Sequence, residues 1–98
     1  MLTPVTPLAA PPHNTELPLD QRTVQINGQT YPYMCQLVWA GLATLPGLPA
    51  TVVPVGLTPD GLPVGLQVVG PHGGDRTTLA AAARIEEILG GFTAPPSP

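Results

Sequence analysis

The sequence predicts an α/β fold: a small mixed sheet with about two helices, incomplete without further strands or a partner. Residues 50–55 and 62–69 are almost wholly apolar, which is typical of strands that are buried on both faces. Apolar side chains recur at helical spacing in residues 33–45 and 75–89. Because one helix on each face is thin cover for such strands, we expect upstream strands or an oligomeric partner to complete the sheet.

The first third of the chain is predicted to contain a strand, a long loop and a hairpin. Residues 1–22 open with a strand over residues 1–5, and their prolines then hold the chain extended and remove backbone donors. Residues 23–32 are predicted to form a β-hairpin. Its two alternating runs flank Asn27-Gly28, a pair that is typical of type I′ turns.

A helix is predicted over residues 33–45, beginning at Pro32 or Tyr33. Proline is tolerated at a helix start because the first amides have no intrahelical partner. Pro46-Gly47 is expected to end the helix. Its apolar stripe consists of Met34, Leu37, Val38, Leu42 and Leu45, widened by Trp39 and Ala43.

Two buried strands are predicted within residues 50–69. The turn that joins them is Thr58-Pro59-Asp60-Gly61, in which proline presets one central dihedral angle and Gly61 can adopt a positive φ. Pro54 and Pro63 lack the amide that a sheet interior requires, so we expect them at strand ends or bulges.

The last helix, over residues 75–89, has the clearest boundaries. Asp75 is the expected N-cap, and Gly90-Gly91 the expected C-terminal stop before a proline-rich tail over residues 90–98. The predicted apolar face consists of Leu79, Ala82, Ala83, Ile85, Ile88 and Leu89.

Charge is sparse in this chain, and it restricts the classes of partner. The formal net charge is −3, Arg22, Arg76 and Arg84 are the basic side chains, and lysine is absent. Nucleic-acid phosphates and anionic membrane surfaces both require clustered cations, so we expect neither as a partner. A single cysteine, Cys35, excludes an internal disulfide, and neither a signal peptide nor a bilayer-spanning apolar run is apparent. We therefore expect a cytoplasmic protein.

Several stretches together resemble the C-terminal segment of the amidase-signature family. Residues 39–56 contain Gly-Leu-Pro-Ala and then Pro-Val-Gly, and residues 60–71 contain Gly-Leu-Pro-Val-Gly-Leu-Gln. Residues 2–7 resemble the family strand that ends in a Pro-Thr-x-Pro-like turn, and residues 74–76 open an apolar helix. The resemblance covers nearly the whole chain, and it is specific because these motifs occur together at these separations. Within the family, the chain resembles the 6-aminohexanoate-cyclic-dimer-hydrolase-like amidases.

This resemblance implies a large mixed sheet flanked by helices and hydrolysis of an amide C–N bond without a cofactor. The family chemistry relies on a serine nucleophile, a second serine joined by a cis peptide bond, and a lysine base, all upstream of the part matched here. The chain has no lysine, and its only serine is Ser97 in the tail. A serine nucleophile needs an adjacent base. We therefore assign no catalytic, metal-binding or cofactor-binding residue and expect no activity from this chain alone.

Other interpretations of single residues are weaker. Cys35 with His13 or His72 could form a thiol nucleophile or a metal site, but no local motif or ligand spacing supports either. We expect Cys35 to be a small buried side chain on the helix that begins near Pro32.

The remaining candidates are also expected to be structural. Residues 70–75 precede a helix and could hold an anion, but Asp75 would repel it and no lysine follows the glycines. Glu86 and Glu87 are adjacent and so diverge on a helix, as on a solvated face. Trp39 could line a substrate pocket, although core packing is expected.

Three hypotheses follow for the whole protein. The first is a truncated or partial amidase whose reading frame starts at an internal Met1 within a strand. The second is an independent, non-catalytic module that self-associates, preferably as a symmetric dimer. The third is a subunit that docks onto a separately encoded N-terminal amidase half. The sequence of the DNA upstream of the reading frame would discriminate among them.

Overall fold

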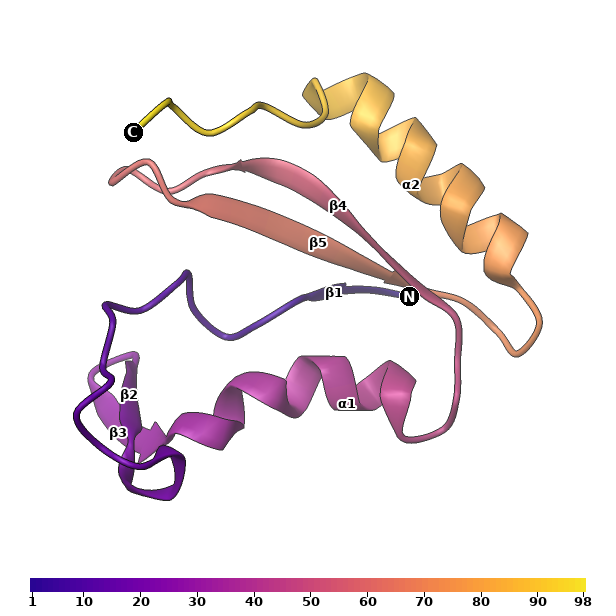
Figure 1. The fold of residues 1–98 in the computed structure, drawn as a ribbon. Coiled ribbons are helices and arrows are strands. Elements are labelled where there is room, and N and C mark those ends of the chain that lie inside the picture. The colour runs from indigo at the N-terminus through magenta and orange to yellow at the C-terminus, as the bar shows by residue number, and fades with distance from the viewer.

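The computed structural model describes all 98 residues, and its centre is a three-stranded antiparallel sheet in the order β1–β5–β4 (Figure 1). The strands are β1 (Leu2–Pro4), β4 (Ala50–Leu57) and β5 (Pro63–Val69). Thr3 lies opposite Gln67 on one side of β5, and Val53 lies opposite Leu66 on the other. The central strand β5 therefore pairs with the N-terminal strand β1 on one side and with β4 on the other.

Helix α2 (Asp75–Leu89) covers one face of this sheet and packs mainly on β4 (Figure 1). Val53, Val68 and Ala82 form the buried core between the helix and the two longer strands. A small side chain at position 82 lets the helix approach the sheet closely. Four partly buried side chains surround this core: Val55, Leu66, Ala81 and Ile85.

The opposite face of the sheet is covered by α1 (Val38–Thr44), which follows the 3₁₀ helix η2 (Tyr33–Leu37). Ala43 is the buried residue of α1. Val52, which lies between two residues of the α2-facing side, remains 53% exposed. The cover on this face is therefore thin, as the sequence predicts.

A second, two-stranded sheet is formed by β2 (Thr23–Ile26) and β3 (Gln29–Pro32), after the short 3₁₀ helix η1 (Leu19–Gln21). We call residues 6–37 the hairpin lobe. Asn27 and Gly28 have φ of 51° and 78°, the left-handed values that a type I′ turn requires, so the predicted hairpin is confirmed.

Pro54 and Pro63 of the central sheet lie where a missing amide is tolerated. Pro63 is the first residue of β5, and Pro54 lies at the register shift between Pro54 and Gly56. Gly65 permits the close approach that its strand requires, because a Cβ at this position would lie 3.0 Å from Val52 Cγ1 and 3.3 Å from Val5 Cγ2.

Two predicted helix starts differ from the structure. The helix predicted over residues 33–45 begins as five residues of 3₁₀ helix, and no side chain caps it. Its first turn therefore satisfies backbone groups by hydrogen bonds between residues three apart, in place of the four-residue spacing of an α-helix. Asp75 is not the N-cap of α2. Gly74 occupies that position, because a Cβ there would lie 2.9 Å from Pro71 O. Asp75 instead lies in the first turn, where its charge still favours the helix.

The predicted apolar face of α2 is only partly buried. Leu79, Ile88 and Leu89 are 59%, 74% and 52% exposed, whereas Thr78 is 2% exposed. The helix contacts the sheet through small side chains, so the large ones lie beside the contact. The predicted stop is confirmed, because Gly90 adopts the left-handed conformation.

The chain is less compact than a typical domain of the same length. Nine of 98 residues are buried. The radius of gyration is 15.2 Å, whereas a compact domain of this length has about 12.6 Å. The longest helix, α2, has 15 residues, and no helix combines the length and apolarity needed to cross a bilayer.

Candidate functional site

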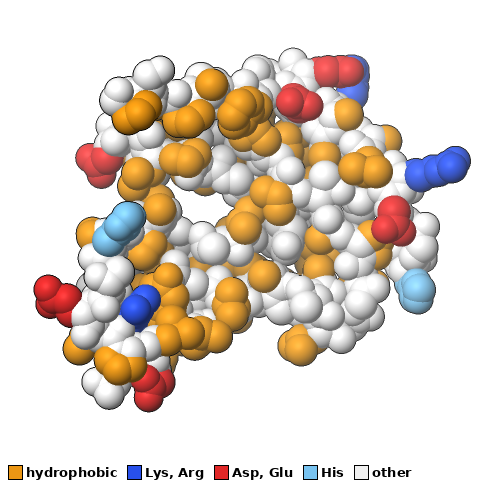
Figure 2. Space-filling view, viewed as in Figure 1, with side chains coloured by type: hydrophobic (Ala, Val, Ile, Leu, Met, Phe, Trp, Pro, Cys, Tyr) orange, Lys and Arg blue, Asp and Glu red, His pale blue; other side chains and the backbone are white.

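The residues that the sequence suggested for thiol or metal chemistry lie in separate segments. Cys35 is a free, half-buried thiol on η2. His13 lies in the proline-rich loop and His72 in the loop after β5, and the two histidines lie at opposite ends of the face in Figure 2. No three histidine, cysteine or acidic side chains gather where they could hold a metal ion.

The glycine-rich loop before α2 is filled by its own atoms. Gly74 N–H donates to Pro71 O, and Thr78 N–H donates to Gly74 O. A Cβ at Gly70 would lie 2.6 Å from Thr78 Cγ2. The loop is therefore a packed turn that positions α2.

Glu86 and Glu87 diverge along the helix. Glu87 forms an ion pair with Arg84 on the exposed surface, whereas Glu86 lies against Gly91. Two carboxyl groups that serve as acid and base must face one reacting bond. This pair does not.

A buried polar network, which the sequence did not indicate, joins the central sheet to α1. Gln67 Nε2 donates to Thr3 Oγ1 and to Trp39 O, both at 3.1 Å. Gln67 and Thr3 are each 5% exposed. On the other face, Thr51 Oγ1 donates to Thr78 Oγ1 at 3.0 Å. Trp39 is half-buried, and the expectation that it packs in the core and does not line a substrate pocket stays a prediction.

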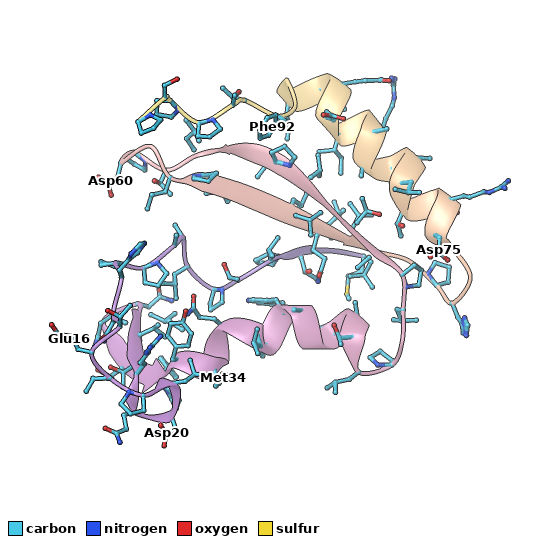
Figure 3. All side chains as sticks on the ribbon, viewed as in Figure 1. Glu16, Asp20, Met34, Asp60, Asp75 and Phe92 are labelled. Atoms are coloured by element: carbon cyan, nitrogen blue, oxygen red, sulfur yellow. The ribbon has the colours of Figure 1, made fainter.

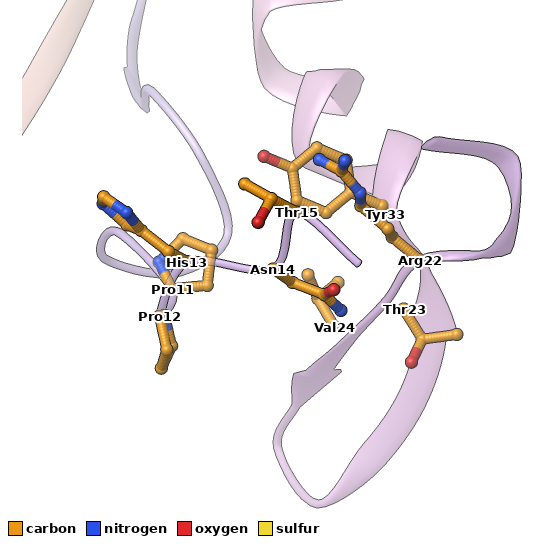
Figure 4. Close-up of a pocket in the computed structure, with 9 residues that line it drawn as sticks. All are labelled: Pro11, Pro12, His13, Asn14, Thr15, Arg22, Thr23, Val24 and Tyr33. Atoms are coloured by element: carbon orange, nitrogen blue, oxygen red, sulfur yellow. The ribbon is translucent and has the colours of Figure 1, made fainter. Parts of the chain in front are cut away.

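The hairpin lobe contains a pocket of about 260 Å³, drawn in Figure 4. Arg22 lies in its wall, and Arg22 Nε donates to Leu17 O at 2.7 Å. A wider hollow adjoins it and reaches Asp60 and Leu62 in the turn after β4. The lining of the smaller pocket consists of Pro11, Pro12, His13, Asn14, Thr15, Arg22, Thr23, Val24 and Tyr33.

The chain alone offers no serine nucleophile with a lysine base. Ser97 lies in the tail after α2, outside any helix or strand, and the sequence has no lysine. The structure instead defines a partial α/β domain, with large apolar side chains exposed on its sheet and helices (Figures 2 and 3).

Comparison with known proteins identifies the family. The sequence model of the amidase family matches residues 1–79. Fatty-acid amide hydrolase 2 of Homo sapiens is 35% identical over 96% of this chain, and a glutamyl-tRNA(Gln) amidotransferase protein of Salinispora tropica is 38% identical over 97%. The indoleacetamide hydrolase of Allorhizobium ampelinum is 54% identical over 44% of the chain. The chain belongs to the amidase family.

These matches cover a small part of each relative. The chain spans 15% of the human hydrolase, 17% of the Salinispora protein and 9% of the indoleacetamide hydrolase. The family resemblance is thus confirmed for a chain much shorter than the relatives that it matches.

Proposed function

We propose that this chain is the C-terminal part of an amidase-signature hydrolase and supplies architecture, while upstream sequence supplies the catalytic groups. The supporting observation is the near-complete match of this chain to relatives of which it spans only 15 to 17%. The parent reaction would be hydrolysis of a carboxylic amide C–N bond by a serine, a cis-linked serine and a lysine. With no lysine and one serine in the tail, the chain is inactive by itself.

The contribution of this chain would be the β1–β5–β4 sheet with its two helices. Exposed apolar side chains border both sheet faces: Val52 on the α1 side, and Leu79 and Ile88 beside the α2 contact. Several exposed large apolar side chains on one small domain are typical of an interface. The N-terminal amidase half is the partner that we propose for it.

The first test measures amide hydrolysis by the purified chain. Indoleacetamide and a simple aliphatic amide should both remain intact. Turnover that disappears in Cys35→Ala would contradict the proposal and support the thiol interpretation. Turnover that persists in this variant would indicate a contaminating enzyme, which a second purification would remove.

The second test is a hybrid enzyme in which residues 1–98 replace the matching region of human fatty-acid amide hydrolase 2, which aligns with 96% of this chain. We expect measurable hydrolysis of a fatty-acid amide by the hybrid. Val52→Asp should reduce hydrolysis by the hybrid, because the buried face would receive a charge, yet leave the isolated chain folded. A hybrid that is indifferent to Val52→Asp would contradict the proposed docking face.

Self-association is the second candidate role, and the open edge of β4 favours it. β4 has eight residues, pairs with β5 on one side only, and is predominantly apolar. Such edges promote pairing between chains. Native mass spectrometry should then show a dimer that Val52→Asp weakens, whereas a monomer at high concentration would contradict this role.

A further inference from the structure

The lining of the pocket in the hairpin lobe includes one guanidinium and several hydrogen-bonding groups, whereas the carboxylates of Glu16 and Asp60 line the adjoining hollow. We propose that this pocket binds the carboxylate group of a small organic acid, with Arg22 as its ionic partner. The proposal goes beyond the proposed function and does not depend on it, because every lining residue lies between Pro11 and Tyr33.

Arg22 is held in place while most of its donors stay free. Its Nε–H donates to Leu17 O at 2.7 Å, which fixes the guanidinium in the pocket wall. The side chain is half-buried, and its terminal nitrogens make no hydrogen bond with the protein. The one ion pair of the structure joins Arg84 to Glu87, so Arg22 has no acidic partner. A partly desolvated cation of this kind favours an anion that arrives from solution.

Uncommitted polar side chains accompany Arg22. Tyr33 N–H donates to Arg22 O at 3.0 Å, and this bond keeps the two residues adjacent. Figure 4 shows Thr15, Arg22 and Tyr33 grouped at one end of the pocket, with His13 at the other. The side chains of Asn14, Thr15 and Tyr33 form no hydrogen bond with the protein. They can therefore donate to the oxygens of a bound anion.

The charge and size of the site favour a carboxylate over a phosphate. A planar guanidinium matches the two oxygens of a carboxylate, and one cation balances one negative charge. A phosphate carries more negative charge and is usually held by several cationic side chains. Arg22 is the one arginine in the lining of this pocket, and the chain has no lysine. The volume of about 260 Å³ lies just below the range of about 300–1,000 Å³ for sites of drug-sized ligands. Pro11, Pro12 and Val24 provide apolar wall for a short carbon chain.

The test is an NMR titration of the 98-residue chain at constant ionic strength. The probes are sodium butyrate, its neutral isostere butyramide, and inorganic phosphate. We expect butyrate to produce saturable shifts at Arg22 Nε–H, the Asn14 side-chain amide and the Tyr33 backbone amide. Butyramide should produce none. Absence of saturable shifts with butyrate, or tighter binding of phosphate than of butyrate, would overturn the proposal.

Two arginine variants separate the site from general charge. Arg22→Gln retains a donor for Leu17 O but loses the cation, and we expect butyrate affinity to fall about tenfold or more. Arg76→Gln removes the same charge from the exposed first turn of α2 and should leave affinity unchanged. Equal losses in both variants, or no loss in Arg22→Gln, would show that the pocket is not the site.

A second measurement keeps the proposal testable if the isolated chain gives a poorly dispersed spectrum. Calorimetry with butyrate on the hybrid enzyme should then show heat of binding that Arg22→Gln removes and Arg76→Gln keeps. Absence of that heat in a folded hybrid overturns the proposal. Because an inactive hybrid can still bind butyrate, failure of the carboxylate site is distinguishable from failure of the proposed function.

Discussion

The central sheet with α2 and the hairpin lobe are built in different ways. In the first region, strand pairing and small side chains bury Val53, Val68 and Ala82 between the sheet and α2, and Gln67 on the opposite face. In the hairpin lobe, Val24 is the one buried residue. The lobe is held by its turn and by local bonds such as Arg22 Nε to Leu17 O. Burial therefore stabilises one region, and chain geometry with polar bonds stabilises the other.

The largest expected effect comes from a charge introduced into the core between the sheet and α2, which tests whether burial stabilises this region. Val53→Asp places a charge in the core, at a side chain that is 3% exposed, and should lower the free energy of unfolding by about 3 kcal/mol or more. Val52→Asp, one residue away but 53% exposed, should change it by about 0.5 kcal/mol or less in the isolated chain. Urea unfolding measures both, and equal effects would contradict the assignment of the two faces.

A second prediction concerns the contact between the loop and α2. Gly70→Ala should cost about 1–3 kcal/mol of stability, because its Cβ would lie 2.6 Å from Thr78 Cγ2. Gly41→Ala is the matched control in α1, where the nearest atom lies at 3.8 Å, and it should stabilise by about 0.5–1 kcal/mol. Thermal unfolding of the two variants gives the comparison, and opposite signs are expected.

A third prediction, Val24→Ala, tests how much burial contributes to the stability of the hairpin lobe. The variant removes the one buried side chain of the lobe, and we expect a cost of about 1 kcal/mol, since a thinly packed site can collapse around the loss. Hydrogen exchange should accelerate at the amides of β2 and β3 and stay unchanged at β4 and β5. Uniform acceleration across both sheets would mean that the two regions unfold together.

The smallest effect is expected outside both packed regions. Arg84→Ala removes the exposed ion pair with Glu87, whose side chains are 76% and 62% exposed. Exposed pairs contribute about 0–1 kcal/mol, so the melting temperature should barely change. A large decrease in that temperature would indicate a role for Arg84 that the structure does not contain.

Local chemistry explains what the sequence predicted well. The turn at Asn27-Gly28, the stop at Gly90 and the positions of Pro54 and Pro63 each follow from the backbone preferences of single residues. Helix α2 was predicted within one residue at its start. The N-cap assignment was wrong because the tight turn closed by Gly74 N–H and Pro71 O places Gly74 at the N-cap and Asp75 in the first turn.

Contacts between distant segments explain what the sequence left out. Gln67 reads as a polar residue in an apolar strand, and its partners Thr3 and Trp39 lie 64 and 28 residues away. In the sequence, Arg22 is likewise an isolated charged residue, whereas in the fold it lines the same pocket as Asn14 and Tyr33. The family motifs within residues 2–7 and 39–76 do not include the lining residues of this pocket, so these motifs did not indicate it.

The pairing of β1 with β5 has a consequence for the order of folding. Thr3 is synthesised 64 residues before its partner Gln67. At about 5–20 residues per second, β1 waits several seconds on the ribosome without its strand partner. The β4–β5 hairpin is local and can form soon after it emerges, whereas closure of the long loop to β1 is entropically slower. Of the three strands of this sheet, β1 is thus expected to be the last to pair, and during that interval β5 presents a second open edge.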